Sequence, residues 1–157
     1  MGCCQAVNTQ IESKNKLDVH ALTNIYSIEP KVLGAGAFGK VFLGHNRRST
    51  EHQVAVKVIS KVRFESELDF IRQEVKILRS LDHPNIVKYH ETYEDSKYLY
   101  LVMEYCQGGE LLESITRNFF SEKEACKIMQ DVLRAINHCH CLGIAHRDIK
   151  PENLMYD

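Results

Sequence analysis

The sequence has no long hydrophobic run, little net charge and no regular cysteine spacing, and each absence excludes a class of protein. No apolar segment approaches the roughly 20 residues that a helix needs to cross a bilayer, and the N-terminus has no apolar signal core. The 20 basic residues nearly balance the 21 acidic ones, so the composition does not indicate a nucleic-acid partner. The six cysteines lack the spacing of a disulfide framework and are typical of cytosolic thiols. The 157 residues therefore predict one cytoplasmic globular domain, or a piece of a larger one.

The first residues, MGCC, match an acylation site imperfectly. Removal of the initiator methionine would leave Gly2 available for myristoylation. Because one acyl chain holds a membrane only marginally, a second lipid on Cys3 or Cys4 is the expected partner. The usual pattern has Ser or Thr where this chain has Ala6, and the alternative is a disordered start with incidental cysteines. We expect residues 1–25 to form a flexible leader, either cytoplasmic or in peripheral contact with a membrane.

Five short segments after residue 25 have the composition of strands. They are rich in Val, Ile and Tyr and are bounded by turn residues such as NRRST and EDS. The segments are YSIEPKVLG, KVFLG, HQVAVKVI, NIVKYHETY and YLYLVMEY. This pattern predicts an antiparallel, meander-like sheet.

A glycine-rich stretch, LGAGAFGKV (33–41), separates the first two segments, and its residues Gly34, Gly36 and Gly39 form a GxGxxG motif. Glycines allow a backbone to approach a phosphate closely because no Cβ intervenes. In a dinucleotide-binding fold, a helix would follow the motif, with an acidic residue about 20 positions further on. Here KVFLG continues as a strand, so the motif favours a phosphate-binding loop between two strands over a Rossmann fold.

Two charged residues, Lys57 and Glu74, have apolar neighbours in the sequence. Lys57 shares a strand face with Ala55, and a lysine on an inner face needs an anion. The alternative is an ordinary lysine on the solvent face of an edge strand. The segment 64–81 has helical spacing of apolar residues, and Glu74 falls inside that stripe, where a carboxylate is costly unless a cation meets it. We therefore expect Lys57 and Glu74 to pair.

The second half of the chain predicts a change from sheet to helix. Residues 100–112 run from a buried strand into a Gly-Gly bend and the start of a helix. A longer helix follows, with Ser121 and Glu124 as a capping box, one apolar face and an end at Gly143. The run HCHC (138–141) has the composition of a metal cluster, but consecutive helical residues point about 100° apart and cannot converge on one ion. We interpret this run as the end of the helix.

The segment HRDIKPEN (146–153) places an acid, a cation and an amide in an irregular loop. Asp148 can receive a hydroxyl proton, Lys150 can hold a charged phosphoryl group and Asn153 can ligate a metal, which are the parts that phosphoryl transfer requires. Pro151 cannot continue a helix and fixes the loop. The alternative, a charged surface loop, does not explain why the glycine motif, the lysine and the glutamate precede it in this order.

With these motifs, residues 26–157 resemble the protein kinase family. LGAGAFGKV resembles its glycine-rich loop, VAVK its third-strand lysine motif and HRDIKPEN its catalytic loop, with Glu74 as the partner of the lysine on the C helix. Lys150 is typical of serine/threonine kinases, and YCQGGELLE, DHPNIVKYHETYED and the leader resemble calcium/calmodulin-dependent and calcium-dependent protein kinases. The resemblance implies an α+β protein-kinase-like fold. A small lobe (26–105) with a five-stranded antiparallel sheet and a C helix would precede the hinge and the beginning of the helical large lobe (106–157).

The resemblance also implies a site for ATP and Mg²⁺. Asp148 would orient the substrate hydroxyl or accept its proton, Lys150 would stabilise the transferring phosphoryl group and Asn153 would bind magnesium. His146 would be a structural strut. The other nucleotide-site residues would come from the glycine loop, the sheet, the C helix, the hinge and the floor of the adenine site: Leu33, Gly34, Gly36, Gly39, Val41, Ala55, Lys57, Glu74, Met103, Glu104, Cys106 and Met155.

Two further carboxylates, Glu110 and Glu152, match positions that face arginine before the phosphorylated residue in basophilic kinases. They would favour protein substrates that are basic around the target Ser or Thr. The DFG motif, the activation loop and the later helices of the family do not occur in these residues, and calcium regulation would need a region beyond Asp157. We therefore expect a truncated piece of a serine/threonine kinase that is inactive alone. A naturally truncated, non-catalytic nucleotide-binding or regulatory module is the alternative.

Overall fold

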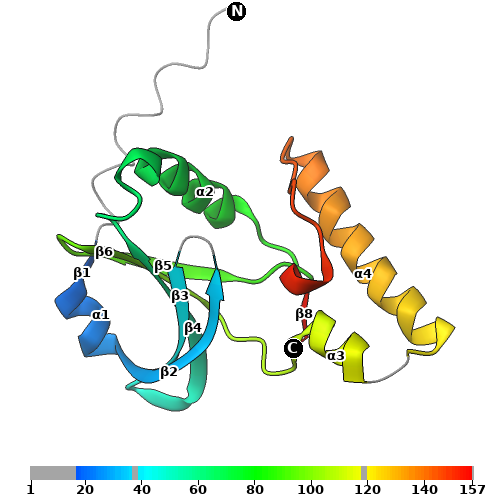
Figure 1. Ribbon diagram of the computed structural model, residues 1–157, viewed down its shortest axis with the longest axis horizontal. Helices are drawn as coiled ribbons and strands as arrows, with labels where there is room; N and C mark the ends of the chain where they lie inside the picture. Colours follow the sequence, from blue (N-terminus) through cyan, green and yellow to red (C-terminus); the bar gives the residue numbers. More distant parts are fainter. Residues whose placement is uncertain (1–16, 37–38, 118–119, 157) are drawn as a thin grey trace, which may run out of the picture. The chain divides into compact units, whose positions relative to one another are not determined.

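The computed structural model describes residues 17–36, 39–117 and 120–156, which belong to two compact units (Figure 1). Unit 1 is Met1–Leu68 with His90–Met103, and unit 2 is Asp69–Tyr89 with Glu104–Asp157. Across the described ranges, no helix is long and apolar enough to span a bilayer.

A six-stranded sheet forms most of unit 1. Its strands are β1 (Leu17–Asp18), β2 (Tyr26–Gly36), β3 (Gly39–Asn46), β4 (Ser49–Ser60), β5 (Tyr89–Glu94) and β6 (Tyr98–Glu104). Their order is β1-β5-β6-β4-β3-β2, and β3 pairs antiparallel with both β2 and β4 (Figure 1). Strands β2 to β6 confirm the five-stranded sheet that the sequence predicts. The fourth strand starts at Tyr89 rather than Asn85, because the preceding residues form a turn in which the amide of Ile86 donates to the carbonyl of His83 at 3.0 Å.

The segment before β2 differs from the sequence prediction. Strand β1 pairs in parallel with β5, with Leu17 opposite Tyr93, and helix α1 (Val19–Ile25) follows it. Leu22 of α1 is 1% exposed. It belongs to a buried cluster with Tyr26, Val54, Val56, Tyr93 and Val102. Burial of this apolar helix face stabilises a helix that is too short to form alone. The prediction of a flexible leader is therefore wrong for residues 17–25, whereas residues 1–16 lie outside the described ranges.

The end of α1 is fastened to the turn between β3 and β4. The backbone amide of Arg47 donates to the carbonyl of Ile25 at 2.8 Å, and its Nε donates to the carbonyl of Thr23 at 2.7 Å. Both bonds satisfy carbonyl groups that a helix leaves free at its C-terminus. The hydroxyl of Tyr26 donates to Glu91 Oε1 at 2.6 Å, and burial together with this hydrogen bond raises the pKa of Tyr26. The segment from Leu17 to Tyr26 is thus a built part of unit 1.

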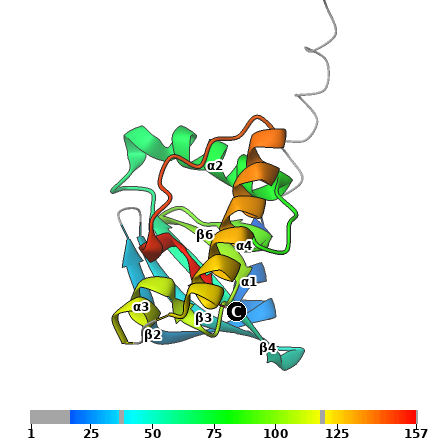
Figure 2. The ribbon, with the colours of Figure 1, turned by 90° about the vertical axis from the view of Figure 1, so that its right-hand side faces the viewer.

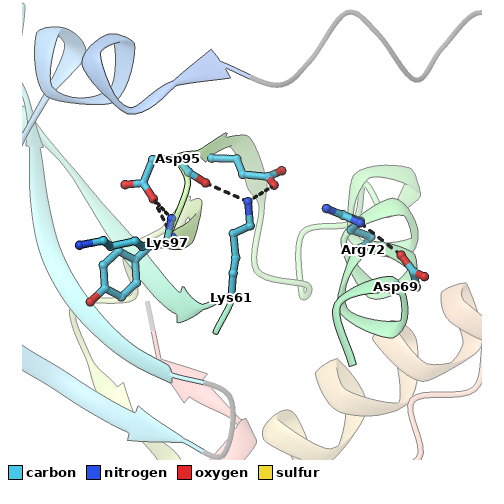
Figure 3. A network of polar contacts seen from close by, with 7 residues as sticks. Lys61, Asp69, Arg72, Asp95 and Lys97 are labelled. Atoms are coloured by element: carbon cyan, nitrogen blue, oxygen red, sulfur yellow. Dashed lines mark hydrogen bonds and ion pairs between the residues drawn. The ribbon is translucent and has the colours of Figure 1, made fainter. Parts of the chain in front are cut away.

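A polar network holds the turn between β5 and β6 (Figure 3). Lys61 Nζ, just after β4, donates to the carbonyl of Asp95 at 2.9 Å. Asp95 Oδ1 accepts hydrogen bonds from the amides of Lys97 and Tyr98 at 2.7 Å and 2.6 Å, and Oδ2 accepts one from the Tyr100 hydroxyl at 2.9 Å. Burial opposes ionisation of Asp95, but the hydrogen bonds outweigh it and lower the pKa of this carboxyl. The ionised carboxylate fixes the turn.

Unit 2 contains the larger helices and a two-stranded sheet. Its elements are α2 (Leu68–Ser80), β7 (Gly109–Glu110), α3 (Leu111–Arg117), α4 (Glu122–Cys141), the 3₁₀ helix η2 (Pro151–Asn153) and β8 (Met155–Tyr156). A further 3₁₀ helix, η1 (Glu65–Glu67), precedes α2. The capping box of Ser121 and Glu124 is present at the start of α4, and Gly143 has a φ of 71° just after its end, as the sequence predicts. Strands β7 and β8 pair antiparallel, and η2 lies beside α3 (Figure 2).

The buried face of α2 is narrower than the predicted apolar stripe. Ile71 and Val75 are buried, whereas Glu74 is exposed and Phe70 is 58% exposed. The buried pair is spaced i, i+4, and the exposed pair forms the neighbouring row, which is rotated by about 100° around the helix. The prediction that Glu74 lies within the buried stripe is therefore wrong. Its role as the partner of Lys57, which the resemblance also implies, stays a prediction.

Candidate active site

In unit 1, the glycine motif spans the turn of the β2–β3 hairpin. Gly34 lies opposite Val41 and Gly36 opposite Gly39, while residues 37 and 38 lie outside the described ranges. A Cβ added to Gly39 would overlap the carbonyl oxygen of Val58 in β4, so packing requires glycine there. Among the described residues, no atom lies within 4 Å of the position that a Cβ would take at Gly34 or Gly36. Packing therefore does not require glycine at these two positions, and the space beside them is open to a ligand.

The strand that carries Lys57 is internal to the sheet. β4 lies between β3 and β6, so the alternative that placed Lys57 on an edge strand is wrong. Val41 is directly opposite Lys57, and Leu43 is opposite the buried Ala55. Directly opposite residues share a face, as do residues two apart on one strand, so Val41, Lys57 and Ala55 lie on the same face of the sheet. Within the described residues of unit 1, no carboxylate pairs with Lys57, which leaves its ammonium group available for an anion.

Two other residues assigned to the nucleotide site, Leu33 and Met103, also belong to unit 1. Leu33 is half-buried in β2, next to Gly34, and Met103 is half-buried near the end of β6. Their contact with a nucleotide stays a prediction.

In unit 2, the catalytic-loop residues form one polar cluster. Lys150 Nζ lies 2.9 Å from Asp148 Oδ2, and Asn153 Nδ2 donates to the carbonyl of Asp148 at 2.8 Å and to its Oδ2 at 2.9 Å. The amide of Asp148 donates to His146 Nδ1 at 3.3 Å, which agrees with a structural role for this histidine. Lys150 first, and Asn153 second, hold the pKa of Asp148 below its ordinary value, and Asp148 raises the pKa of Lys150. Asp148 is thus a fixed, ionised and exposed carboxylate.

The cluster continues directly into the β7–β8 pair. The amide of Gly108 donates to the carbonyl of Tyr156 at 3.0 Å, and the amide of Leu111 donates to the carbonyl of Leu154 at 2.8 Å. Between these bonds, Glu110 lies opposite Met155, so the two side chains lie on one face of the pair. The Gly-Gly bend and the segment after the catalytic loop are therefore one structural element, which the sequence did not reveal because each strand has two residues.

The two carboxylates assigned to substrate recognition, Glu110 and Glu152, both lie near the catalytic loop. Glu110 is half-buried in β7, and Glu152 is exposed in η2, an element that contacts β7. Within the described part of unit 2, neither side chain forms a hydrogen bond or an ion pair. Both carboxylates are available to a cationic ligand.

The hinge residue Glu104 makes contacts that the sequence did not predict. Its amide donates to the carbonyl of Lys88 at 2.9 Å, and its Oε2 accepts a hydrogen bond from the amide of Lys88 at 3.0 Å. The side chain therefore holds the hinge to the loop that precedes β5. The carbonyl of Cys106 accepts a hydrogen bond from the amide of Gly109 at 3.4 Å, which begins the Gly-Gly bend.

The hydrogen bonds of Asn153 show whether its side chain could bind a metal ion. Both side-chain hydrogen bonds of Asn153 use its amide nitrogen, which leaves the amide oxygen free, and amide oxygens suit hard cations such as Mg²⁺. In the described ranges, no group of three or more His, Cys, Asp or Glu side chains could hold a metal ion. Asn153 therefore fits the part of a single ligand to a metal that arrives with a nucleotide.

The structure thus describes the predicted site in two parts. The glycine loop and Lys57 are in unit 1, whereas Glu74, the hinge and the catalytic loop are in unit 2. The acylation residues Gly2, Cys3 and Cys4 lie outside the described ranges.

The chain is similar to known protein kinases in both sequence and structure. The family model for the protein kinase domain matches residues 27–157. Calcium-dependent protein kinase 5 of Plasmodium falciparum is 43% identical over 136 residues, which cover 86% of this chain and 24% of that protein. Calcium/calmodulin-dependent protein kinase type 1B of Rattus norvegicus is 41% identical over 142 residues, which cover 90% of this chain and 41% of that protein.

The crystal structure of Rad53 residues 1–466 in complex with AMP-PNP is similar, with a TM-score of 0.76 and 35% sequence identity. The match covers 85% of this chain and 35% of that one. The chain thus spans between about a quarter and two fifths of the length of these relatives. With the family model matched over most of its length, the chain belongs to the protein kinase family.

Proposed function

We propose that the protein is an ATP-dependent serine/threonine kinase that transfers the γ-phosphoryl group of ATP to hydroxyl groups of protein substrates. The observation that carries this proposal is the cluster in which Lys150 and Asn153 hold the ionised carboxylate of Asp148. A solvent-exposed carboxylate fixed on one side by a cation and an amide keeps its other lone pairs free for a substrate hydroxyl.

The low pKa of Asp148 decides how it acts. Because Lys150 and Asn153 stabilise the charged form, Asp148 is a weak base at neutral pH. In the loose transition state of phosphoryl transfer, the attacking hydroxyl needs alignment more than early deprotonation. Asp148 therefore orients the hydroxyl by accepting its hydrogen bond, and it receives the proton late. The ammonium of Lys150 lies beside the same carboxylate, where it offsets the negative charge of an arriving phosphoryl group.

Nucleotide binding is supported by features of both units. The open space beside Gly34 and Gly36 lets backbone amides approach phosphates. The ammonium of Lys57, which no carboxylate meets within the described part of unit 1, provides a cation. Glu74 would orient that cation. In unit 2, the free amide oxygen of Asn153 would hold Mg²⁺. When bound, magnesium neutralises phosphate charge and fixes phosphate geometry.

Substrate choice follows from the free carboxylates. Glu110 and Glu152 have no ion-pair partner in the described part of unit 2, and both lie on elements next to the catalytic loop. Two unpaired carboxylates attract cationic side chains and repel acidic ones. The protein substrates are therefore basic near the phosphorylated residue. The serine/threonine preference is supported by Lys150 in the catalytic loop.

An N-terminal lipid anchor is part of the proposal on the basis of sequence alone. Gly2 supplies the acceptor for the first acyl chain, and Cys3 or Cys4 the acceptor for the second.

The decisive test is a phosphorylation assay of the complete protein with magnesium-ATP and a basic peptide. Asp148→Asn keeps the size of the side chain but removes the charge, and we expect kcat to fall by about 10²- to 10⁴-fold. Asp131→Asn is the matched control, because Asp131 is a carboxylate of α4 whose ion pair is with Arg134 of the same helix. Activity that survives Asp148→Asn would refute the proposed function. Nucleotide binding without transfer in the wild-type protein would favour the non-catalytic alternative.

A further inference from the structure

Gly108 is a glycine that the fold requires for contact rather than for backbone conformation. The described glycines with positive φ are Gly39, Gly109 and Gly143, so an alanine could adopt the backbone conformation of Gly108. A Cβ added at Gly108 would overlap Cβ of Tyr156 and would lie 3.0 Å from its carbonyl oxygen and 3.1 Å from its carbonyl carbon. Because all three atoms are fixed to the backbone of β8, none of them can rotate away. A methyl group at position 108 must therefore shift β8 relative to the Gly-Gly bend.

The strand that would be displaced is attached directly to the catalytic loop. Tyr156 and Met155 form β8, and Asn153 ends η2 two residues before Met155. Leu154 is the single residue between η2 and β8, and its amide donates to the carbonyl of Pro151 at 3.3 Å, which ties the start of β8 to η2. A shift at β8 is therefore transmitted to Asn153.

Asn153 passes such a shift to the reacting groups. Its amide nitrogen forms two of the hydrogen bonds of Asp148, and its amide oxygen is the free acceptor that fits a metal ion. Met155, on the other side, is 45% exposed and is the residue assigned to the adenine floor. Gly108 does not contact the reacting groups. It determines the position of β8, which contains Met155 and directly follows Asn153 and Leu154.

We infer that Gly108 is a positioning residue of the kinase site. Because Gly108 has no side chain, the Gly-Gly bend can pack directly against β8, and this contact fixes the positions of Met155 and Asn153. The inference rests on the proposed function, because it assigns these two residues to nucleotide and metal. Ordinary contact between carbon atoms needs about 3.5–4.0 Å, so the methyl group of alanine would move β8 by roughly 1 Å. A misplacement of about 1 Å in an active site lowers activity by up to about 10²-fold.

The test compares four variants in the complete protein: Gly108→Ala, Tyr156→Gly, the double variant, and Gln107→Ala as an exposed neighbour in the same bend. The KM for ATP and kcat are measured with a basic peptide, and amide hydrogen exchange is followed across residues 105–113. We expect Gly108→Ala to lower kcat/KM for ATP by about 10- to 100-fold, with a raised KM. Exchange should accelerate at the amides of residues 108 and 111, which donate to the carbonyls of Tyr156 and Leu154. The double variant removes the nearest contact, with Cβ of Tyr156, but keeps the contacts with the carbonyl group, so it should recover part of the loss. Gln107→Ala should match the wild type.

The opposite results are equally definite. Unchanged kinetics in Gly108→Ala would overturn the inference, and so would a lower melting temperature with normal KM and kcat per folded molecule, which indicates a structural role alone. If Gly108→Ala yields no folded protein, the double variant decides: folding with a near-normal KM supports the inference, and failure to fold overturns it. A wild-type protein without activity would refute the proposed function instead, and hydrogen exchange would still show whether the methyl group opens the bend.

Discussion

Replacing Leu22 by alanine tests whether α1 belongs to the folded small lobe. Leu22 is 1% exposed and packs against Tyr26, Val54 and Tyr93 in the core of unit 1. Buried Leu→Ala substitutions cost about 2–5 kcal/mol, and the cost is smallest where the surroundings can move into the gap. Because α1 has seven residues and is held at one end by Arg47, it can shift partly into the cavity, so we expect about 2–3 kcal/mol. That loss corresponds to a fall of roughly 5–10 °C in the melting temperature of the kinase domain.

The assay is thermal unfolding of the complete protein, followed by near-ultraviolet circular dichroism. Asn24→Ala is the control, because Asn24 is exposed on the same helix and its loss should change stability by less than about 0.5 kcal/mol. If Leu22→Ala and Asn24→Ala unfolded at the same temperature, α1 would not be docked in solution, and the original prediction of a flexible leader would be right.

Four further predictions follow from the site and its surroundings. Lys57→Met should lower kcat/KM by at least about 10²-fold, because it removes a cation that contacts the phosphates. The melting temperature should change little, because the lysine has no partner in the described part of unit 1. A nearly normal kcat would exclude Lys57 from the site. The pKa of Asp148 is lowered, so its carboxylate stays charged as pH falls below the ordinary carboxyl range. Lys150→Met removes the largest cause of this shift, so a carbon NMR titration should show that the Asp148 carboxylate is protonated at a higher pH in this variant. Ser121→Ala should destabilise α4 by about 1 kcal/mol, measured by urea unfolding beside Ser121→Asp, which keeps a capping oxygen. Gly2→Ala should move the protein from the membrane fraction to the supernatant, and an unchanged distribution would favour the incidental-cysteine alternative.

The parts of the fold that the sequence predicted correctly depend on local patterns. Short runs rich in Val, Ile and Tyr between turn residues predicted β2 to β6, and the spacing of Ser121 and Glu124 predicted the start of α4. The polar residues of HRDIKPEN predicted the cluster around Asp148, because Lys150 and Asn153 lie within five residues of it and can reach it within one loop.

The parts that were missed depend on contacts between distant residues. Leu22 and Ile25 have the spacing of a helix face, but seven residues are too few to predict a helix without the sheet that covers them. On α2, the apolar residues span a broad arc, so sequence alone could not show that Ile71 and Val75, and not Phe70, are buried. The β7–β8 pair joins residues 45 and 47 positions apart through the backbone, which no side-chain pattern reports.

The parallel pairing of β1 with β5 decides how tension on the N-terminus would enter the molecule. A pull on Leu17 reaches β1 first, and its two residue pairs with β5 would separate before the other strands of the sheet do. The force then acts on α1, which is held by the buried side chain of Leu22. The two hydrogen bonds from Arg47 connect the end of this helix to the turn of the β3–β4 hairpin. That turn lies at the opposite end of β3 from Gly39. Tension on the N-terminus would therefore enter the β2–β3 hairpin at the end opposite the glycine loop, where Tyr26 pairs with Asn46.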